Sequence, residues 1–527
     1  LSRRRGSIAM LAALLVLPIP PLAVARAAAA QVAEAWMHAT PIEALGEWQS
    51  ARLTGMGGLT VSSEDRFSRL NAYEYGQNPA GLLGLRDTSW AEQGSEYQDF
   101  DDGYYGESHS AVSRKSGIRG AVQNEKWALG VDFLYASVNA SRHDLMGTPD
   151  NSRFIRDFDI PFATSFNPIT GDRTIGARVV YPGLALTYAR RAPMLRWLTV
   201  GARFGFREET EDRRIIDPYP LNNDAKATEY TGGAVIRLPH TNAIRLAGFG
   251  QYVHDKVNAS SKTPLNDDNF EWERPTIAYG AELLVGTGRI RGIVDGRHRS
   301  YDGEQVARIN WAPQFFMNPF PSTTDTRYVF KKRWSSFLSG YRHNEASTRW
   351  MADLPWLPAH LGAEWGYYRE YEWIRPNPDV LLMALPLDVR RLGYRAAAGL
   401  SLDLPDAAGQ IAFEVHANRD FRNDFLNLVP DISSSERSYH LGAEYKVAHW
   451  LPLRAGVALL RNDPDRRDAI APYKGIQASV GAGTYWGMLG AHVDAAYSHT
   501  HFHHEPTDPS LEIGMGNQAV LTLSRLF

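Results

Sequence analysis

The sequence predicts an all-β fold: a transmembrane antiparallel β-barrel of about 18 strands, with 14 or 16 strands as the alternatives. Three observations predict it. Apolar and polar residues alternate with a period of two over most of the chain from about Trp90 onward, which is typical of strands. Short connections alternate with long polar ones, as they do in outer-membrane barrels. The chain also ends in an apolar strand whose last residue is Phe527.

The first observation, the alternation, gives each predicted strand one apolar face and one small, polar or charged face. Between 127 and 135 the odd positions carry Trp, Leu, Val, Phe and Tyr, and the pattern recurs at 198–206, 277–285, 439–447 and 453–459. A soluble β-sandwich shows the same alternation. We favour the barrel because glycine and alanine are frequent on the polar face, and because aromatic residues gather near strand ends as an interfacial girdle requires.

The second observation, the connections, sets the strand count. The short ones lie at 124–126, 191–195, 238–242, 286–289, 405–409 and 448–452, and the long ones lie near 143–173, 213–227, 259–272, 304–328, 374–390, 424–435 and 463–472. Counting hairpins back from Phe527 gives roughly 17 strands to Ser108, and a strand at roughly 87–100 makes about 18. This count is even, as a closed bacterial barrel needs.

The third observation is the C-terminal strand. Ala519, Leu521 and Leu523 share a face with Phe527 in "GNQAVLTLSRLF". Such a strand resembles the signal that the barrel-assembly machinery recognises, so we expect that machinery and outer-membrane lipid as partners. Arg525 departs from the apolar face, and near the rim its guanidinium can reach the interface at small cost.

The N-terminus has the three-part layout of a secretory signal peptide. Arg3 to Arg5 form a positive region, residues 8–24 are apolar, and residues 25–31 are mostly small. Pro18, Pro20 and Pro21 interrupt an apolar stretch that is already short for a membrane anchor, which is the alternative interpretation. We expect cleavage near 28–30, a signal peptide over 1–30, and export to the bacterial outer membrane.

Composition excludes several function classes. The 56 Lys and Arg residues nearly balance the 59 Asp and Glu residues, so no basic excess indicates a nucleic-acid partner. Cysteine is absent, which removes disulfides, thiolate metal sites and cysteine nucleophiles. The chain lacks Gly-x-Ser-x-Gly, His-Glu-x-x-His and P-loop motifs. We therefore expect no enzyme and no cofactor, with an outer-membrane hydrolase as the minor alternative.

The segment before the first strand does not alternate and is rich in glycine. Two elements in it, "ARLTGMGG" (51–58) and "NPAGL" (78–82), resemble the N-terminal signature of FadL-type outer-membrane transporters of long-chain fatty acids and other hydrophobic compounds. The residues between the elements depart from the family pattern, and the strand count exceeds that of the family. An ordinary periplasmic extension is the alternative interpretation of the segment.

The resemblance implies a hatch over 31–86 that plugs a barrel over 87–527. It also implies passive, hatch-gated diffusion of a hydrophobic small molecule, fatty-acid-like or aromatic. The candidate hatch and solute-binding residues are Leu53, Gly55, Met56, Gly57, Gly58, Leu59, Phe67, Asn78, Pro79, Ala80, Gly81 and Leu82. An open porin for hydrophilic solutes and a barrel that serves as a secretion or adhesion partner remain the alternatives.

The alternation also assigns a set of charged side chains to the lumen. They are Asp132, Arg203, Arg207, Glu282, Glu414, Glu444, Lys446 and Arg454. They can form interior salt bridges, or one of the cations can pair with a solute carboxylate. Near the C-terminus, His499, His501 and His503 alternate on one strand face, a spacing that suits zinc or copper. The alternative is a polar strand end that rises into a loop.

Overall fold

The computed structural model describes most of the strands and part of the N-terminal segment. The described residues are 49–63, 78–83, 85, 88–104, 107–144, 173–216, 219–238, 243–262, 267–286, 289–310, 332–376, 387–424, 432–464, 473–486, 490–504 and 513–527. The predicted signal peptide and Phe67 lie outside this part of the chain, as do most residues of the long connections.

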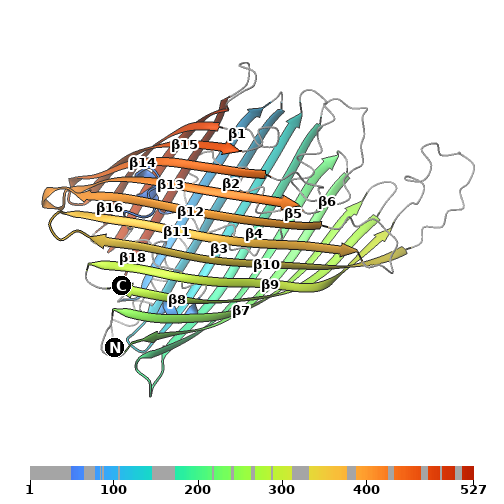
Figure 1. The fold of residues 1–527 in the computed structure, drawn as a ribbon, viewed down its shortest axis with the longest axis horizontal. Coiled ribbons are helices and arrows are strands. Elements are labelled where there is room, and N and C mark those ends of the chain that lie inside the picture. The colour runs from blue at the N-terminus through green and yellow to red at the C-terminus, as the bar shows by residue number, and fades with distance from the viewer. Residues whose placement is uncertain are drawn as a thin grey trace, which may run out of the picture.

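The fold is a closed antiparallel barrel of 18 strands (Figure 1). Each strand pairs with its neighbours in the sequence, and β1 (Trp90–Tyr104) closes the ring by pairing with β18 (Ile513–Leu526). The remaining strands are β2 (Glu107–Gln123), β3 (Trp127–Asp144), β4 (Arg173–Arg191), β5 (Leu198–Ile216), β6 (Tyr219–Arg237), β7 (Ile244–Lys262), β8 (Asp267–Gly286), β9 (Ile290–Asn310), β10 (Lys332–Asp353), β11 (Ala359–Pro376), β12 (Leu387–Asp403), β13 (Gly409–Asp424), β14 (Ile432–Ala448), β15 (Leu451–Pro464), β16 (Tyr473–Trp486) and β17 (Ala491–His504).

The predicted count of about 18 strands is confirmed, including the first strand, which begins at Trp90 rather than near residue 87. The final residue is tied to that strand because the Phe527 amide donates to the Ser89 carbonyl over 2.8 Å. The Arg525 guanidinium carbon lies 4.7 Å from the centre of the Phe527 ring. Closure leaves no open sheet edge, which suits a wall whose backbone must be satisfied internally.

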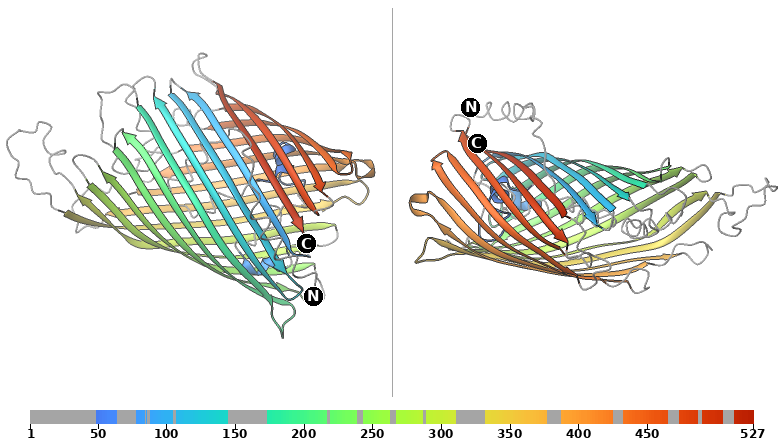
Figure 2. Two further views of the ribbon diagram at one scale, coloured as in Figure 1. Left: turned by 180° about the vertical axis from the view of Figure 1, so that it is seen from behind. Right: turned by 90° about the horizontal axis from the view of Figure 1, so that it is seen from above.

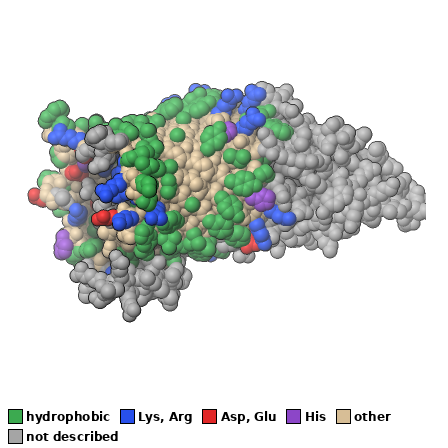
Figure 3. All heavy atoms as spheres, turned by 90° about the horizontal axis from the view of Figure 1, so that it is seen from below, with side chains coloured by type: hydrophobic (Ala, Val, Ile, Leu, Met, Phe, Trp, Pro, Cys, Tyr) green, Lys and Arg blue, Asp and Glu red, His purple; other side chains and the backbone are tan. Residues whose placement is uncertain are grey.

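The outer face of the wall is apolar. In β3, Leu129, Phe133 and Tyr135 are exposed while Ala128 and Asp132 are buried inside. The same alternation places Leu441 and Tyr445 of β14 outside and Glu444 inside. Hydrophobic side chains are spread over the middle of this face, with Lys and Arg side chains toward its two ends (Figure 3). Exposed apolar residues around a closed ring are the pattern of a lipid-facing surface.

Two proline residues interrupt the hydrogen-bonded ladders. Strand β8 pairs with β9 up to Glu271–Val306 and again from Ile277–Ser300, and Pro275 lies in the gap. Pro182 lies in a similar gap between β4 and β5. A proline has no N–H to donate, so it weakens the pairing on the side that its nitrogen faces.

Three short helices accompany the strands in the part of the chain that the structure describes. They are α3 (Ala51–Gly55) and η3 (Pro79–Leu82) in the N-terminal segment, and η5 (Pro405–Ala407) in a turn. Among the described residues, no helix combines the length and the apolar character needed to cross a membrane. The helix α3 lies within the ring of strands when the barrel is seen from above (Figure 2).

Candidate functional site: the N-terminal segment inside the barrel

The candidate site is the contact between the N-terminal segment and the inner face of the wall. We use the name hatch for the described parts of that segment, residues 49–63 and 78–83. The helix α3 packs on β15 to β18, whereas η3 packs on β3 to β6. The hatch therefore rests on two separate arcs of the barrel wall.

Local sequence explains the shape of α3. Ser50 caps the helix, because its hydroxyl accepts a hydrogen bond from the Leu53 amide over 3.3 Å. The helix ends at once in a turn where Gly57 and Gly58 have φ angles of +85° and +76°. Residues with a Cβ rarely adopt this conformation, so the two glycines let the chain reverse tightly against the wall.

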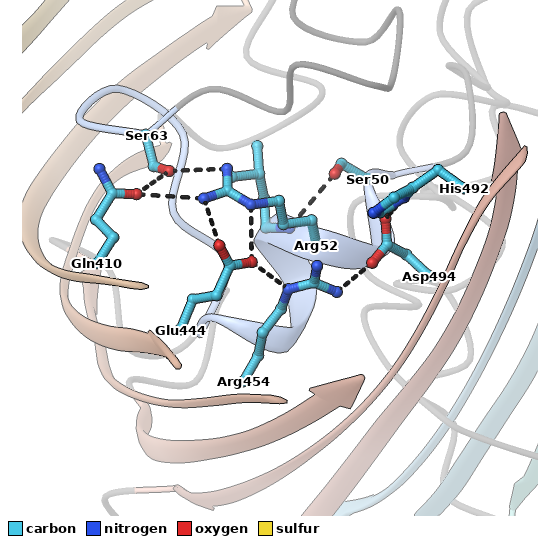
Figure 4. Close-up of polar contacts among 9 residues, drawn as sticks. Ser50, Arg52, Ser63, Gln410, Glu444, Arg454, His492 and Asp494 are labelled. Carbon is cyan, nitrogen blue, oxygen red and sulfur yellow. Dashed lines mark hydrogen bonds and ion pairs between the residues drawn. The ribbon is translucent and has the colours of Figure 1, made fainter. Parts of the chain in front are cut away.

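A network of buried charges attaches α3 to the wall (Figure 4). Arg52 forms two parallel hydrogen bonds with Glu444 of β14, from Nε over 2.9 Å and from Nη2 over 3.2 Å. Arg454 of β15 also donates to Glu444, over 2.6 Å, and it pairs with Asp494 of β17. The Arg454 side chain is 1% exposed. Two guanidinium groups thus share one carboxylate, and one of them belongs to the hatch.

The same arginine organises the end of the segment. Arg52 Nη1 donates to the Ser63 hydroxyl over 3.2 Å, and its Nη2 lies 3.3 Å from Gln410 Oε1. Ser63 in turn donates to Gln410 over 2.7 Å. His492 Nδ1 lies 2.7 Å from Asp494 Oδ2, at the far end of the network. Charged hydrogen bonds of this kind are roughly twice as strong as neutral ones.

Glu414 of β13 holds the stretch 60–62 of the hatch. Its carboxylate is fully buried and accepts hydrogen bonds from the amides of Thr60, Val61 and Ser62 over 2.7 to 2.9 Å. The Ser62 hydroxyl adds a fourth bond over 2.7 Å. An isolated buried carboxylate would be very unfavourable, so the hatch supplies the donors that make its burial possible.

Two histidines continue this contact. His416 Nε2 lies 2.8 Å from Glu414 Oε2, and its ring centre lies 4.4 Å from that of His440. His440 Nδ1 donates to the Gly57 carbonyl over 2.7 Å. The Gly57 carbonyl is thereby satisfied within the barrel.

Glycines in the wall let the hatch backbone approach it closely. A Cβ at Gly442 would overlap the carbonyl of Met56, and a Cβ at Gly456 would overlap the backbone of Gly57. At Gly362 an added Cβ would overlap the carbonyl of Val61. These glycines on the inner face therefore leave the space that the hatch backbone occupies.

The second arc, β3 to β6, also has residues that contact the hatch closely. Asn78 caps η3, accepting from the Ala80 amide over 3.1 Å, and its side-chain amide donates to the Ala234 carbonyl over 3.3 Å. A Cβ at Gly201 would overlap Ala80, and one at Gly233 would overlap Asn78. Leu82 is fully buried in an apolar cluster with Leu83, Trp90, Ala121, Ala128 and Ala189.

The structure brings most of the predicted hatch residues against the wall. Leu53, Gly55, Met56, Gly57, Leu59, Asn78, Pro79, Ala80 and Leu82 are buried, whereas Gly58 and Gly81 are intermediate. Met56 and Leu59 pack with Ala412 of β13.

The predicted lumen charges divide into groups. Glu414, Glu444 and Arg454 contact the hatch or its partners, as described above. Asp132 pairs with Arg203 over 2.9 Å on another arc of the wall, and Arg203 also lies 3.4 Å from Glu229. Arg207 and Glu282 are buried, and Lys446 is exposed near the end of β14.

The three histidines predicted as metal candidates are not among the residues that contact the hatch. His501 and His503 are exposed on the outer face of β17, and His499 contacts Asn517. The described residues contain no group of three or more His, Cys, Asp or Glu side chains placed to hold a metal ion.

Sequence analysis did not single out several residues of the site. Ser62, Ser63, Gln410, His440 and Asp494 all take part in holding the hatch. Their inward parity on the strands could have placed Gln410, His440 and Asp494 in the lumen. No sequence signal could have told which of the inward residues lie under the hatch.

A stack of aromatic rings lines another part of the lumen. Tyr301 of β9, Tyr341 and His343 of β10, and Tyr368 of β11 follow one another with ring centres 5.7, 6.4 and 5.9 Å apart. Their planes differ by 10° to 16°. Tyr368 also donates to Asp420 over 2.7 Å. The stack places aromatic side chains on the inner side of a wall that is otherwise rich in charges, and Tyr301 and Tyr341 within it are buried.

Comparisons with solved structures find barrels of low similarity. The toluene transporter TodX of Pseudomonas putida aligns with a TM-score of 0.37 and 13% identity, covering 91% of this chain and 98% of its own. The toluene transporter TbuX of Ralstonia pickettii gives 0.36 and 11%, and a FadL homologue of Pseudomonas aeruginosa gives 0.38 and 12%, both with the same coverage. No protein-family model matches the chain, and no curated protein sequence matches it.

Proposed function

We propose that this protein is an outer-membrane barrel that admits hydrophobic small molecules, fatty-acid-like or aromatic, by passive diffusion gated by its hatch. The observation that carries the proposal is the attachment of the hatch to the inner wall. Residues 49–63 are held there by the Arg52–Glu444 pair and by the backbone bonds to Glu414. A segment inside the lumen hinders free passage of water-soluble solutes, so passage requires that it move.

The chemistry of the attachment suits a part that can be released. It consists mainly of polar contacts with small apolar clusters, and the Arg52 side chain is 14% exposed. The attraction within a buried ion pair does little more than offset the free energy needed to remove both charges from water. The two partners can therefore separate into water at a moderate cost in free energy. The apolar outer band supports residence in a lipid bilayer, and the aromatic stack on β9 to β11 supports a solute with apolar or aromatic character.

A reversible lock tests the proposal directly. Because the chain has no cysteine, a pair of introduced cysteines gives the protein its only thiols. A Cβ built at Gly55 of α3 lies 3.5 Å from the Cβ of Ala496 on β17, within the range of natural disulfides. The double variant Gly55→Cys/Ala496→Cys would therefore attach the hatch to the wall when oxidised and release it when reduced.

The matched control joins two strands without touching the hatch. A Cβ at Gly205 of β5 lies 3.7 Å from the Cβ of its register partner Ala185 on β4, so Gly205→Cys/Ala185→Cys cross-links the wall alone. We expect oxidation of the hatch lock to abolish uptake of a long-chain fatty acid or a monoaromatic hydrocarbon into vesicles, and reduction to restore it. The control should transport equally in both states. Equal uptake by the oxidised and reduced hatch lock would refute hatch gating.

The same proteins distinguish the alternatives. An open porin would conduct ions steadily in planar bilayers and admit a hydrophilic sugar, whatever the state of the lock. A secretion or adhesion partner would transport neither kind of solute. Deletion of 50–83 should convert a nearly silent barrel into a stable pore if the hatch blocks the lumen.

A further inference from the structure

The outer face of the barrel carries a row of basic side chains at the long-loop end of four adjacent strands. Arg437 of β14 pairs in register with Arg461 of β15, and Arg461 pairs in register with Lys474 of β16. Lys474 is in turn the register partner of His503 on β17. All four side chains are exposed. We use the name basic row for Arg437, Arg461, Lys474 and His503.

The strand parity fixes the direction in which the basic row points. Arg437, Arg461 and Lys474 share the outer face with the apolar side chains Tyr439, Leu459 and Ile476, each of which lies two residues further along the same strand, whereas His503 of β17 has His501 at that place. Those three apolar residues are 45%, 51% and 56% exposed. The basic row therefore lies directly above the upper margin of the apolar band.

Like charges directly opposite each other in a sheet are unfavourable. Register partners on neighbouring strands have Cβ atoms about 5 Å apart, and four strands span roughly 14 Å. Arg461 is partly neutralised by Asp463, which accepts from its Nε over 2.7 Å and from its Nη2 over 3.0 Å. Arg437 and Lys474 lie on either side of that pair in the register.

We propose that the basic row binds the phosphate groups of a multiply phosphorylated glycolipid of the outer leaflet, whose acyl chains lie on the apolar side chains below it. Arginine and lysine are the side chains that bind phosphate, arginine through paired N–H groups and lysine as a point charge. Such a glycolipid carries its phosphate groups next to its acyl chains. It therefore matches a surface that changes from basic to apolar over two residues of β14, β15 and β16. The proposal takes the apolar band as lipid-facing, as the proposed function does, but it does not depend on the hatch.

The experiment measures binding of lipid A, with both phosphates, to the full-length protein in detergent, by fluorescence of a labelled lipid. The test variant is Arg437→Gln/Arg461→Gln/Lys474→Gln. Each cation near an anionic lipid surface contributes about 1 kcal/mol of binding free energy, which is about a fivefold change in affinity. The triple variant should therefore bind roughly 100-fold more weakly. The single variant Lys474→Gln should weaken binding about fivefold.

The matched control removes three exposed cations from the short-turn end of the barrel, as Lys126→Gln/Arg190→Gln/Arg196→Gln. It should bind lipid A as the wild type does. Heat-modified migration on a gel verifies that each variant is folded. If the triple variant fails to fold, the affinity of the single variant Lys474→Gln still tests the proposal. Vesicle conductance of the triple variant should stay at the wild-type level, which separates this proposal from the hatch.

Several results would overturn the proposal. Unchanged affinity in the triple variant, or an equal loss in the control, would show that the basic row is not the site. Equal binding of dephosphorylated lipid A would show that only the apolar band binds. Equal affinity for phosphatidylglycerol would show that any anionic membrane lipid suffices, and displacement by inorganic phosphate alone would assign the site to free phosphate.

Discussion

Replacing Glu414 with glutamine should loosen the hatch without disturbing the barrel. One oxygen of this carboxylate accepts from the Val61 and Ser62 amides and from the Ser62 hydroxyl, and the other accepts from the Thr60 amide and lies 2.8 Å from His416 Nε2. A glutamine keeps one oxygen and presents an NH₂ group in place of the other. If the amide oxygen faces Ser62, the NH₂ group meets the Thr60 N–H, and two donors then oppose each other.

The magnitude follows from these four bonds. A hydrogen bond to a charged group contributes about 1.5–3 kcal/mol, and a neutral one about 0.5–1.5 kcal/mol. Counting only the lost bond to the Thr60 amide, the cost to hatch attachment should be about 3 kcal/mol. Since 1.4 kcal/mol is a factor of ten, the equilibrium constant for opening should rise about 100-fold.

Hydrogen–deuterium exchange of the peptide covering 49–63 measures that opening directly. The protection of its amides should fall about 100-fold in Glu414→Gln, while the amides of the strands keep theirs. The control is Glu229→Gln, which removes a buried carboxylate of the wall that bonds to Thr231 and lies near Arg203. Unchanged exchange in the hatch of Glu414→Gln, or an equal loss in Glu229→Gln, would refute the reasoning.

Three further predictions concern other contacts. Gly442→Ala puts a Cβ into the carbonyl of Met56, and this overpacking of about 1–3 kcal/mol should displace the turn and raise bilayer conductance. As the control, Gly232→Ala meets nothing within 4 Å and should leave the conductance unchanged. Glu444→Met should speed hatch exchange more than Arg52→Met, since it removes the carboxylate that Arg52 shares with the buried Arg454, at about 3–5 kcal/mol. Equal effects would contradict the shared-carboxylate account. Phe413→Arg, on the outer band, should lower the free energy of unfolding in vesicles by about 2–4 kcal/mol, and an unchanged value in denaturant titration would argue against lipid contact there.

The sequence by itself determined the barrel. A side-chain period of two is a local property, so the parity of Trp127 to Tyr135 or of Tyr439 to Val447 could be read without any knowledge of neighbours. The same parity assigned Asp132, Glu414 and Glu444 to the inner face, where they are buried. The alternation of short and long connections gave a count of about 18 strands, which is confirmed. The bounds of two long connections were wrong, because most of 213–227 and 259–272 is strand.

Only the tertiary structure decided where the hatch attaches. Arg52 and Glu444 are 392 residues apart, and Val61 and Glu414 are 353 apart, so no local pattern couples them. Their contact depends on which arc of the wall the segment meets once the ring has closed. The same reason applies to the basic row, because Arg437, Arg461 and Lys474 become neighbours only through strand register. Periodicity sets the face of a residue, whereas closure and register set its partners.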